Sequence, residues 1–383
     1  MKFRLDRKTD NCSCELMKQL ESIELFSGAG GLALGLHAAG FKHRALYEWN
    51  ASAVETLRYN QKMGHPSLEG CEISRADVRD VDFSKYRGVD LVAGGPPCQP
   101  FSMGGKAAGM NDVRDMFPQA IRAVAEARPR AFIFENVRGL LRPAFSNYVE
   151  FIKLQMEFPE FPISENTSWD RNLARLQRHK EQDRKSSDGL RYRVHIHQAN
   201  AANYGVPQQR HRVFFIGFRC DINTDWSFPN ETHKDGSRVG KTSAWRTLSE
   251  AISDLPAPSD RLHKKWHNHI LQNGAKSYPG HTGSPLDRPA KALKAGAHGV
   301  PGGENMILFP DGQVRYLTVR ESARVQTFPD NYVFLGSWTE AMRQLGNAVP
   351  VQLGEIVGRS VAKALLSAKS NQPKSPDETL QSP

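Results

Sequence analysis

The stretch Ser22-Ile23-Glu24-Leu25-Phe26-Ser27-Gly28-Ala29-Gly30-Gly31 decides the fold. Its apolar start is typical of a buried strand, and the glycines after it allow a tight turn into a helix that begins near Leu32. The form Gly-x-Gly-x-x-Ala and the acid Glu48, about 20 residues further on, fit a nucleotide-binding turn in which the acid accepts from ribose hydroxyls. Strand-to-helix turns without a ligand share this pattern, which also does not separate nicotinamide cofactors from S-adenosylmethionine.

Outward from this turn, short apolar runs alternate with segments of helical spacing. Strands are expected at 45–48, 89–93, 131–134 and 213–217, and helices at 51–61 and 116–127. This alternation predicts an α/β fold with a Rossmann-like, mostly parallel sheet. Ligands of such sheets bind beyond the carboxyl ends of the strands, where the notable residues stand: Gly28–Gly31, Glu48, Pro96–Cys98 and Glu135.

The chain is long enough for two domains. The predicted parts are a flexible lead-in at 1–20, a catalytic and cofactor-binding domain at 21–217 with a surface insertion at 145–193, a smaller loop-rich domain at 218–340, a C-terminal helix at 341–366 that returns to the first domain, and a disordered tail at 367–383. The tail is rich in Ser, Pro and Lys, a composition that does not supply a packed core.

Composition excludes several classes of protein. The 383 residues are 39% hydrophobic and 24% charged, which is ordinary for a globular protein. No apolar run approaches the ~18 residues of a membrane span, and the first residues are polar, so a cytoplasmic location and no membrane contact are expected. The five cysteines are an odd number, which favours reduced thiols, and no metal site is expected.

The net charge of +10 favours a polyanionic partner. Charge is concentrated at 261–303, where seven lysines or arginines and five histidines accompany a single acid, Asp287. A solvated flexible loop has the same composition, so this segment alone does not establish binding.

Prolines frame one cysteine in Gly94-Gly95-Pro96-Pro97-Cys98-Gln99-Pro100-Phe101-Ser102. Because proline fixes its own φ and restricts the residue before it, the loop is expected to be stiff. A buried structural cysteine needs no such frame, whereas a nucleophilic thiol must be held close to the carbon that it attacks. The sequence therefore favours Cys98 as a nucleophile.

Two further stretches suit acid–base and anion-binding chemistry. Glu135, followed by Asn136, ends a predicted strand and is expected beside the Cys98 loop, although surface glutamates that cap helices are common. Residues two apart share a face of a strand, so Gln208, Arg210 and Arg212 are expected to point together. A solvated sheet edge is the alternative for these last residues.

At these stretches the chain resembles the DNA cytosine-5 methyltransferase family, in its prokaryotic modification form. The ordered motifs that carry the resemblance are Leu25–Gly31, Gly95–Ser102, Glu135–Val137, Gln208-x-Arg210-x-Arg212, the Arg315–Pro329 stretch and Gly346–Pro350. The weakly patterned region from Phe218 to Val314 falls where that family has its target-recognition region.

The resemblance implies a reaction in which S-adenosylmethionine methylates C5 of a flipped cytosine in double-stranded DNA. Cys98 would add to C6 of the ring, Glu135 would protonate or hydrogen-bond N3, and Arg212 would bind the base carbonyl with Arg210 beside it. Such an enzyme would act as a monomer, paired in function with a restriction endonuclease.

The resemblance also implies a set of cofactor contacts. These are Phe26, Gly28, Gly30 and Gly31 at the methionine end, Glu48 at the ribose, Trp49 and Asp77 at the adenine, and Pro96, Asn347 and Ala348. Glu24 stands where the family more often has Asp. Three alternatives stay open: a tRNA cytosine methyltransferase, whose Cys-Phe-Thr tripeptide is absent here, a nicotinamide-dependent oxidoreductase, and a DNA-binding protein without activity.

Overall fold

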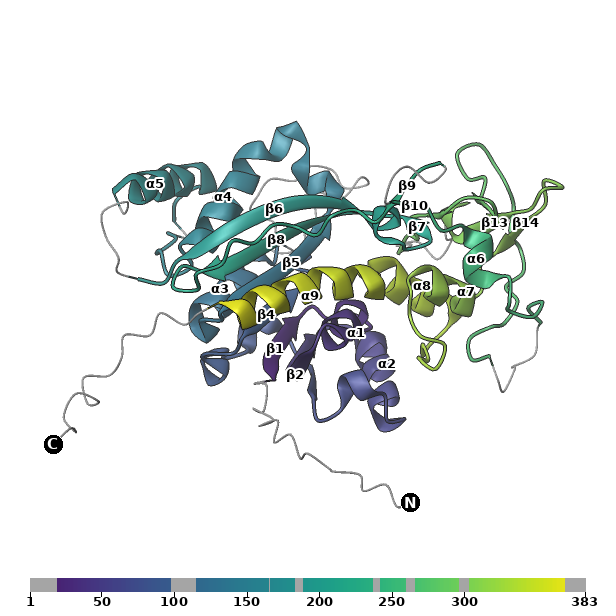
Figure 1. Cartoon of the computed structure of the whole chain (residues 1–383), viewed down its shortest axis with the longest axis horizontal. Coiled ribbons are helices and arrows are strands. Elements are labelled where there is room, and N and C mark those ends of the chain that lie inside the picture. The colour runs from purple at the N-terminus through teal and green to yellow at the C-terminus, as the bar shows by residue number, and fades with distance from the viewer. Residues whose placement is uncertain are drawn as a thin grey trace, which may run out of the picture.

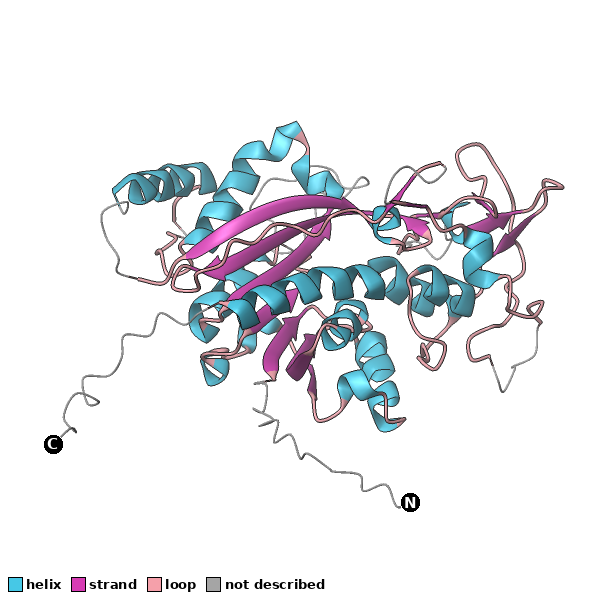
Figure 2. Ribbon diagram, in the orientation of Figure 1, coloured by secondary structure: helices cyan, strands magenta, loops and turns pink. Residues whose placement is uncertain are grey.

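The computed structural model describes residues 19–97, 115–164, 166–182, 189–236, 242–259, 266–295 and 303–368. A seven-stranded sheet runs through the molecule between two layers of helices (Figures 1 and 2). Its strands are β1 (Leu20–Leu25), β2 (Phe41–Glu48), β3 (Glu72–Arg75), β4 (Leu91–Gly94), β5 (Ala131–Val137), β6 (Tyr192–Asn200) and β8 (His211–Arg219).

The strand order is β3-β2-β1-β4-β5-β8-β6. The first five strands in this order are parallel, β8 is antiparallel to β5, and β6 is antiparallel to β8. The predicted α/β fold with a mostly parallel sheet is therefore confirmed. The chain runs from β1 through β2 to β3 on one side and then crosses to β4 on the other side of β1, and such a switch point opens a crevice beyond the carboxyl ends of the strands.

The two faces of the sheet bury different residues because side chains alternate along a strand. On β5, Phe132 and Phe134 join one core cluster, and Ala131 and Ile133 join another. The first face is covered by α3 (Phe117–Ala127), α4 (Ser146–Glu157) and α5 (Trp169–Gln182), and the second by α1 (Gly31–Ala38) and α9 (Val351–Ser367). The helix α2 (Ala51–Lys62) lies beside α1 (Figure 1).

Glycines let α1 and α9 approach closely. A Cβ built on Gly35 would lie 2.6 Å from Val351 O and from Glu355 N, and one built on Gly31 would lie 2.3 Å from Val349 O. These distances leave no room for a methyl group, so the sequence of α1 is fitted to the C-terminal helix.

The prediction of one helix over 341–366 is wrong. The segment forms the end of α8 (Trp338–Asn347) and most of α9. The two helices are separated by Ala348, Val349 and Pro350, and Ala348 has an extended backbone conformation. Proline has no amide hydrogen and disfavours helical geometry in the residue before it, which explains the break. The break places Asn347 and Ala348 at the end of α8.

The prediction of a surface insertion over 145–193 is also wrong for its first helix. Phe151, Ile152 and Leu154 of α4 are buried in the core cluster on the first face of the sheet. The helix α5 packs outside α4, and β6 follows as the edge strand of the sheet. Much of this segment therefore completes the central layer.

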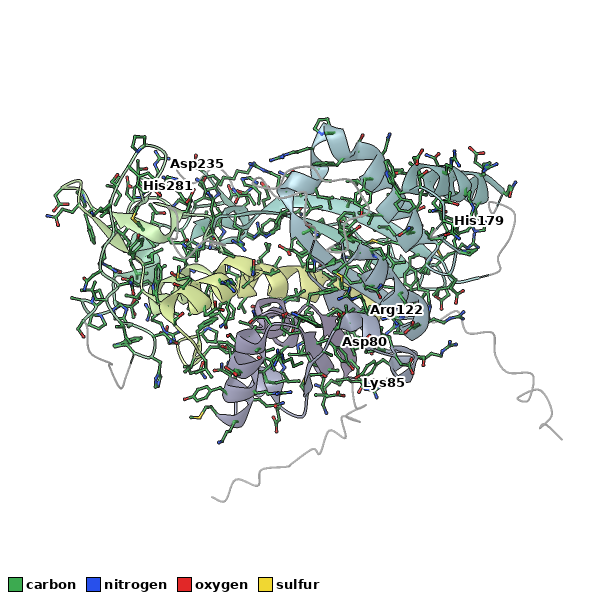
Figure 3. All side chains as sticks on the ribbon, turned by 180° about the vertical axis from the view of Figure 1, so that it is seen from behind. Asp80, Lys85, Arg122, His179, Asp235 and His281 are labelled. Atoms are coloured by element: carbon green, nitrogen blue, oxygen red, sulfur yellow. The ribbon has the colours of Figure 1, made fainter. Side chains whose placement is uncertain are left out.

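The remaining region is rich in loops. It contains β9 (His233–Lys234), β10 (Ser243–Ala244), α6 (Leu248–Ile252), β11 (Ser284–Pro285), β12 (Ala290–Lys291), β13 (Met306–Leu308), β14 (Val314–Tyr316) and α7 (Val319–Val325), and β12 pairs with β7 (Gln208–Gln209). Figure 3 shows Asp235 and His281 of this region at the opposite end of the molecule from His179 of α5. The start of the expected second domain differs, because Trp226 packs with the sheet and donates to Ser360 Oγ of α9 at 3.2 Å.

Several predictions fall on residues outside the described ranges, namely the lead-in at 1–18, the loop 98–114, and the tail from 369 onward. The basic segment 261–303 is described only in part, from 266 to 295 and at 303. Among the described residues, the structure contains no helix with the length and apolar character needed to cross a membrane.

Candidate active site

A pocket of about 380 Å³ opens beyond the carboxyl ends of β1, β2, β4 and β5, and α8 closes its far side. It lies at the switch point of the sheet. Residues named from the sequence meet there from six separate parts of the chain. Those that line it are Phe26, Gly28, Gly31, Glu48, Pro96, Glu135, Arg212, Asn347 and Ala348.

The glycine turn forms one wall of the pocket and is held by Glu48. Gly28 N donates to Glu48 Oε2 at 2.8 Å, and Asn50 N donates to Glu48 Oε1 at 2.7 Å. Phe26 has φ +56° and Gly28 has φ +53°. A left-handed phenylalanine is strained, and such strain persists where the surrounding structure enforces it, commonly at ligand sites.

A second acid lies at the base of the pocket. Glu24 is 1% exposed, and its Oε2 is buried without a hydrogen-bond partner among the described residues. Burial, and then the negative charge of Glu48, raise the pKa of Glu24 well above its usual range. An acid in this state favours a ligand that brings a positive charge or a hydrogen-bond donor.

The ends of β4 and β5 are joined behind the proline loop. Asn136 Nδ2 donates to Pro96 O at 2.9 Å, and Met116 N donates to Pro97 O at 3.2 Å. Pro96 and Pro97 both line the pocket. Cys98, the next residue in the chain, lies outside the described residues.

Glu135 and Arg212 form a buried ion pair at the pocket wall. Arg212 Nε lies 2.5 Å from Glu135 Oε1, and the side chains are 12% and 8% exposed. Burial raises the pKa of Glu135, while the charges of Arg212 and Arg210 partly oppose this rise. A carboxyl group with a raised pKa holds a proton more readily than an exposed one.

Arg210 does not line the pocket, although its charge acts on Glu135 beside Arg212. Its fully buried guanidinium donates to three carbonyl oxygens, those of Leu293 at 3.0 Å, Gly346 at 2.5 Å and Ala348 at 2.9 Å. Arg210 stands between β7 and β8. Arg210 joins the end of α8 to the loop-rich region.

Three predicted cofactor residues are not among those that line this pocket. Gly30 is the left-handed residue that begins α1, behind the pocket wall. Trp49 is 66% exposed and does not line the pocket. The Asp77 carboxylate accepts from the backbone and guanidinium of Arg79, with a shortest distance of 2.5 Å.

Sequence reasoning missed several pocket residues. Glu24, Asn50, Arg343 and Gln344 line it without having been named as site residues. Glu24 carried a usable signal, since an acid inside a buried apolar strand is unusual. Arg343 and Gln344 carried none, because their position depends on how α8 packs against the glycine turn.

Residues 20–167 and 174–363 match the family model of the C-5 cytosine-specific DNA methylases. The chain belongs to this family. As a C-5 cytosine-specific DNA methylase it is an enzyme that transfers a methyl group from S-adenosylmethionine to C5 of cytosine in DNA. The oxidoreductase interpretation of the glycine turn is therefore wrong.

Relatives of this methylase cover nearly its whole length. The Type II methyltransferase M.NgoMIV of Neisseria gonorrhoeae is 36% identical over 360 residues, covering 91% of this chain and 98% of the relative. M.AplI of Arthrospira platensis is 34% identical, with coverages of 94% and 90%.

Solved structures agree on the fold of the methylase. A putative DNA modification methyltransferase from an E. coli prophage aligns with a TM-score of 0.59 and 21% identity, covering 90% of this chain and 99% of that one. DNMT2 of Spodoptera frugiperda aligns with a TM-score of 0.56 and 17% identity, covering 89% and 99%.

Proposed function

We propose that this methylase modifies cytosine within a specific duplex sequence through a covalent adduct with Cys98, as the modification enzyme of a restriction–modification system. The observation that carries the residue assignment is the Glu135–Arg212 pair in the same pocket wall as the two prolines that precede Cys98. The target ring is out of reach inside a duplex, so the base is flipped out at a cost of a few kcal/mol.

In the proposed first step, the Cys98 thiolate forms a bond to C6 of the ring. The electron pair of the C5–C6 double bond moves into the ring, which takes up a proton at N3 from Glu135. Arg212, beside Glu135, donates to the base carbonyl and stabilises the charge that develops there. The raised pKa of Glu135 supports its role as the proton donor.

The second half of the reaction returns the thiol. When bound, S-adenosylmethionine supplies the electrophilic methyl group that C5 takes up. Loss of the C5 proton to solvent then re-forms the double bond as the bond between Cys98 and C6 breaks, and the N3 proton returns to Glu135. Cys98 leaves as the thiolate and is ready for another ring.

The pocket fits the cofactor in charge and shape. Glu24 offers an unpartnered buried carboxyl oxygen to a cationic ligand, and S-adenosylmethionine carries an ammonium and a sulfonium group. A Cβ built on Gly28 would meet no atom within 4 Å, so a side chain there would extend into open space beside the turn. We assign Phe26, Gly28, Gly31 and Asn347 to the methionine end and Glu48 to the ribose.

The partners follow from the relatives. Two similar proteins are named Type II methyltransferases, which supports a modification role and functional pairing with a restriction endonuclease. We further propose that the enzyme acts as a monomer on chromosomal DNA in the cytoplasm. The Lys and Arg residues of the segment 261–303 would then contact the phosphate backbone.

A duplex containing 5-fluorocytosine tests the proposal, because fluorine at C5 prevents the final elimination and traps the adduct. We expect the wild-type enzyme to give a complex that survives a denaturing gel and Cys98→Ser to give none. Cys220→Ser is the matched control, since Cys220 is an exposed cysteine outside the pocket. An adduct with Cys98→Ser, or methylation of tRNA in preference to duplex DNA, would overturn the proposal.

A further inference from the structure

Tyr332 lies directly behind the glycine turn. Its hydroxyl donates to Ala29 O at 2.8 Å, and the side chain is fully buried. A Cβ built on Gly30 would lie 3.2 Å from the Tyr332 hydroxyl and 2.9 Å from Leu57 Cδ2. Tyr332 is therefore packed against the side of the turn that faces away from the pocket.

Tyr332 adds a restraint to the part of the turn that Glu48 does not contact. Gly28, Gly30 and Gly31 are three glycines in four residues, and glycine adopts many backbone conformations at little cost. The peptide group that joins Ala29 to Gly30 is planar, and its N–H donates to Ser27 O at 2.9 Å, so a contact to its carbonyl oxygen holds the other side of the same group. The Tyr332 hydroxyl contacts this carbonyl.

The segment 329–335 that carries Tyr332 is anchored to α2. Val333 N donates to Asn60 Oδ1 at 2.9 Å, and Asn60 Nδ2 donates to Val333 O at 2.7 Å. Leu335 N donates to Thr56 Oγ1 at 3.0 Å. These hydrogen bonds fix the position of the segment relative to α2.

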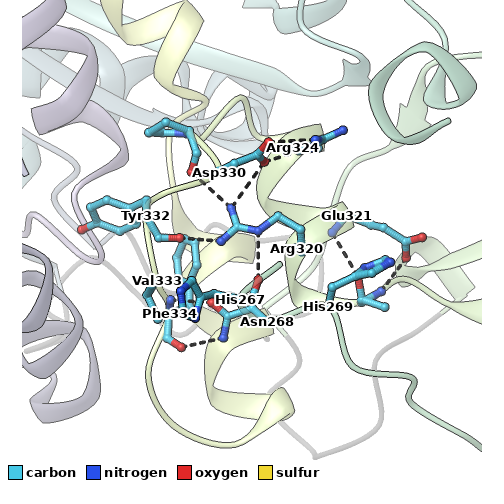
Figure 4. Close-up of polar contacts among 12 residues, drawn as sticks. His267, Asn268, His269, Arg320, Glu321, Arg324, Asp330, Tyr332, Val333 and Phe334 are labelled. Atoms are coloured by element: carbon cyan, nitrogen blue, oxygen red, sulfur yellow. Dashed lines mark hydrogen bonds and ion pairs between the residues drawn. The ribbon is translucent and has the colours of Figure 1, made fainter. Parts of the chain in front are cut away.

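The same segment is held from the loop-rich region. Arg320 is fully buried and donates to Tyr332 O at 2.7 Å, Pro329 O at 3.1 Å and His267 O at 3.0 Å. Figure 4 shows the Tyr332 carbonyl facing Arg320 while its ring points away. The ring thus extends from a fixed backbone toward the turn.

We propose that Tyr332 is a positioning residue for cofactor binding, holding the glycine turn in its binding conformation through Ala29 O. This inference rests on the proposed assignment of the pocket to S-adenosylmethionine. It gives a residue of the loop-rich side of the chain, far from the turn in sequence, a defined effect on the affinity for the cofactor.

Tyr332→Phe removes only the hydroxyl. The matched control is Tyr192→Phe, since Tyr192 is also buried and donates to one carbonyl oxygen, Pro129 O, at 2.7 Å, away from the pocket. The measurement is the Kd for S-adenosylhomocysteine by titration calorimetry, with the unfolding midpoint recorded for each variant. One buried neutral hydrogen bond corresponds to roughly a threefold to tenfold change in affinity.

We expect Tyr332→Phe to weaken S-adenosylhomocysteine binding by about threefold to tenfold and Tyr192→Phe to change it by less than twofold. The KM for S-adenosylmethionine should rise in step, with kcat little changed. If both variants lose similar stability and both keep the wild-type Kd, Tyr332 has only a structural role and the inference fails. If the wild-type protein itself does not bind S-adenosylhomocysteine, the assignment of the pocket fails as well.

Discussion

Arg212 Nε lies 2.5 Å from Glu135 Oε1 because β8 runs antiparallel to β5 and pairs Arg212 with Val137. The two side chains come from distant parts of the chain and meet at one end of the sheet. In the pocket wall, Glu135 can donate a proton, and the Arg212 cation beside it stabilises the negative charge that the donation leaves on the carboxylate. The arrangement leads to a first prediction about the acid.

Glu135→Gln should lower methyl transfer to duplex DNA by about 10²- to 10⁴-fold, the usual contribution of a general acid. Binding of S-adenosylhomocysteine should stay within about twofold, because the amide keeps the size of the side chain. The assay is incorporation of radiolabelled methyl groups. Glu126→Gln is the control, since Glu126 pairs with Arg122 on α3 outside the pocket, and equal losses in both variants would contradict the role of Glu135.

Arg210 and Arg212 should separate into a structural and a catalytic residue. Arg210→Met leaves three buried carbonyl oxygens without their donor, so we expect a loss of about 3 kcal/mol or more in the free energy of unfolding. Compared with Arg210→Met, Arg212→Met should lower the free energy of unfolding less and lower the rate of methyl transfer more. Urea unfolding and methyl transfer measured on both variants check this, and the reverse pattern would return Arg210 to the reaction.

Gly35→Ala should destabilise the protein by about 1–3 kcal/mol, the usual cost of overpacking. Its Cβ would lie 2.6 Å from backbone atoms of α9, which do not move aside easily. Gly354→Ala, on the facing helix, is the control, because its Cβ would lie 3.4 Å from Leu32 Cδ1, an ordinary contact. Denaturant unfolding should show a lower free energy of unfolding for Gly35→Ala only. Comparable decreases in both variants would argue against tight packing at Gly35.

His43 should make the fold sensitive to acid. The imidazole is buried between Ser22 Oγ and Ala33 O, and burial lowers its pKa from 6.5 to about 4. As the pH falls below 6.5, the unfolded chain binds the proton before the folded one does, so stability is lost between pH 6.5 and pH 4 by up to about 3 kcal/mol.

Urea unfolding at intervals across this pH range measures the effect. His43→Gln should flatten the curve of unfolding free energy against pH, whatever it costs at neutral pH. A variant curve parallel to that of the wild-type protein would show that His43 is not the group responsible.

The sequence was most informative where strands are buried and end in polar residues. The runs that end at Glu48, Gly94 and Glu135 form central strands, and their ends do meet at one pocket. The edge strand β6 was missed although Arg193, His195 and His197 alternate with apolar residues, the period of two that is typical of a strand with one exposed face.

The remaining differences arise from tertiary structure. Arg210 sits at a break between two strands, so its side chain turns toward Gly346 and Ala348, and no local pattern reports that turn. The pocket residues from α8 depend on a helix break at Pro350 that an apolar repeat conceals. Glu24 was visible in the sequence, but its burial became clear only with the packing around it.

The close fit between α1 and α9 also orders events during synthesis. The first helix of the chain exposes Leu32 and Leu36 to water until the last helix has left the ribosome and packed over them. A nascent chain that lacks residues 351–367 therefore leaves one side of α1, the helix that follows the glycine turn, without its cover. The first helix of the fold therefore packs fully only once α9 has been synthesised.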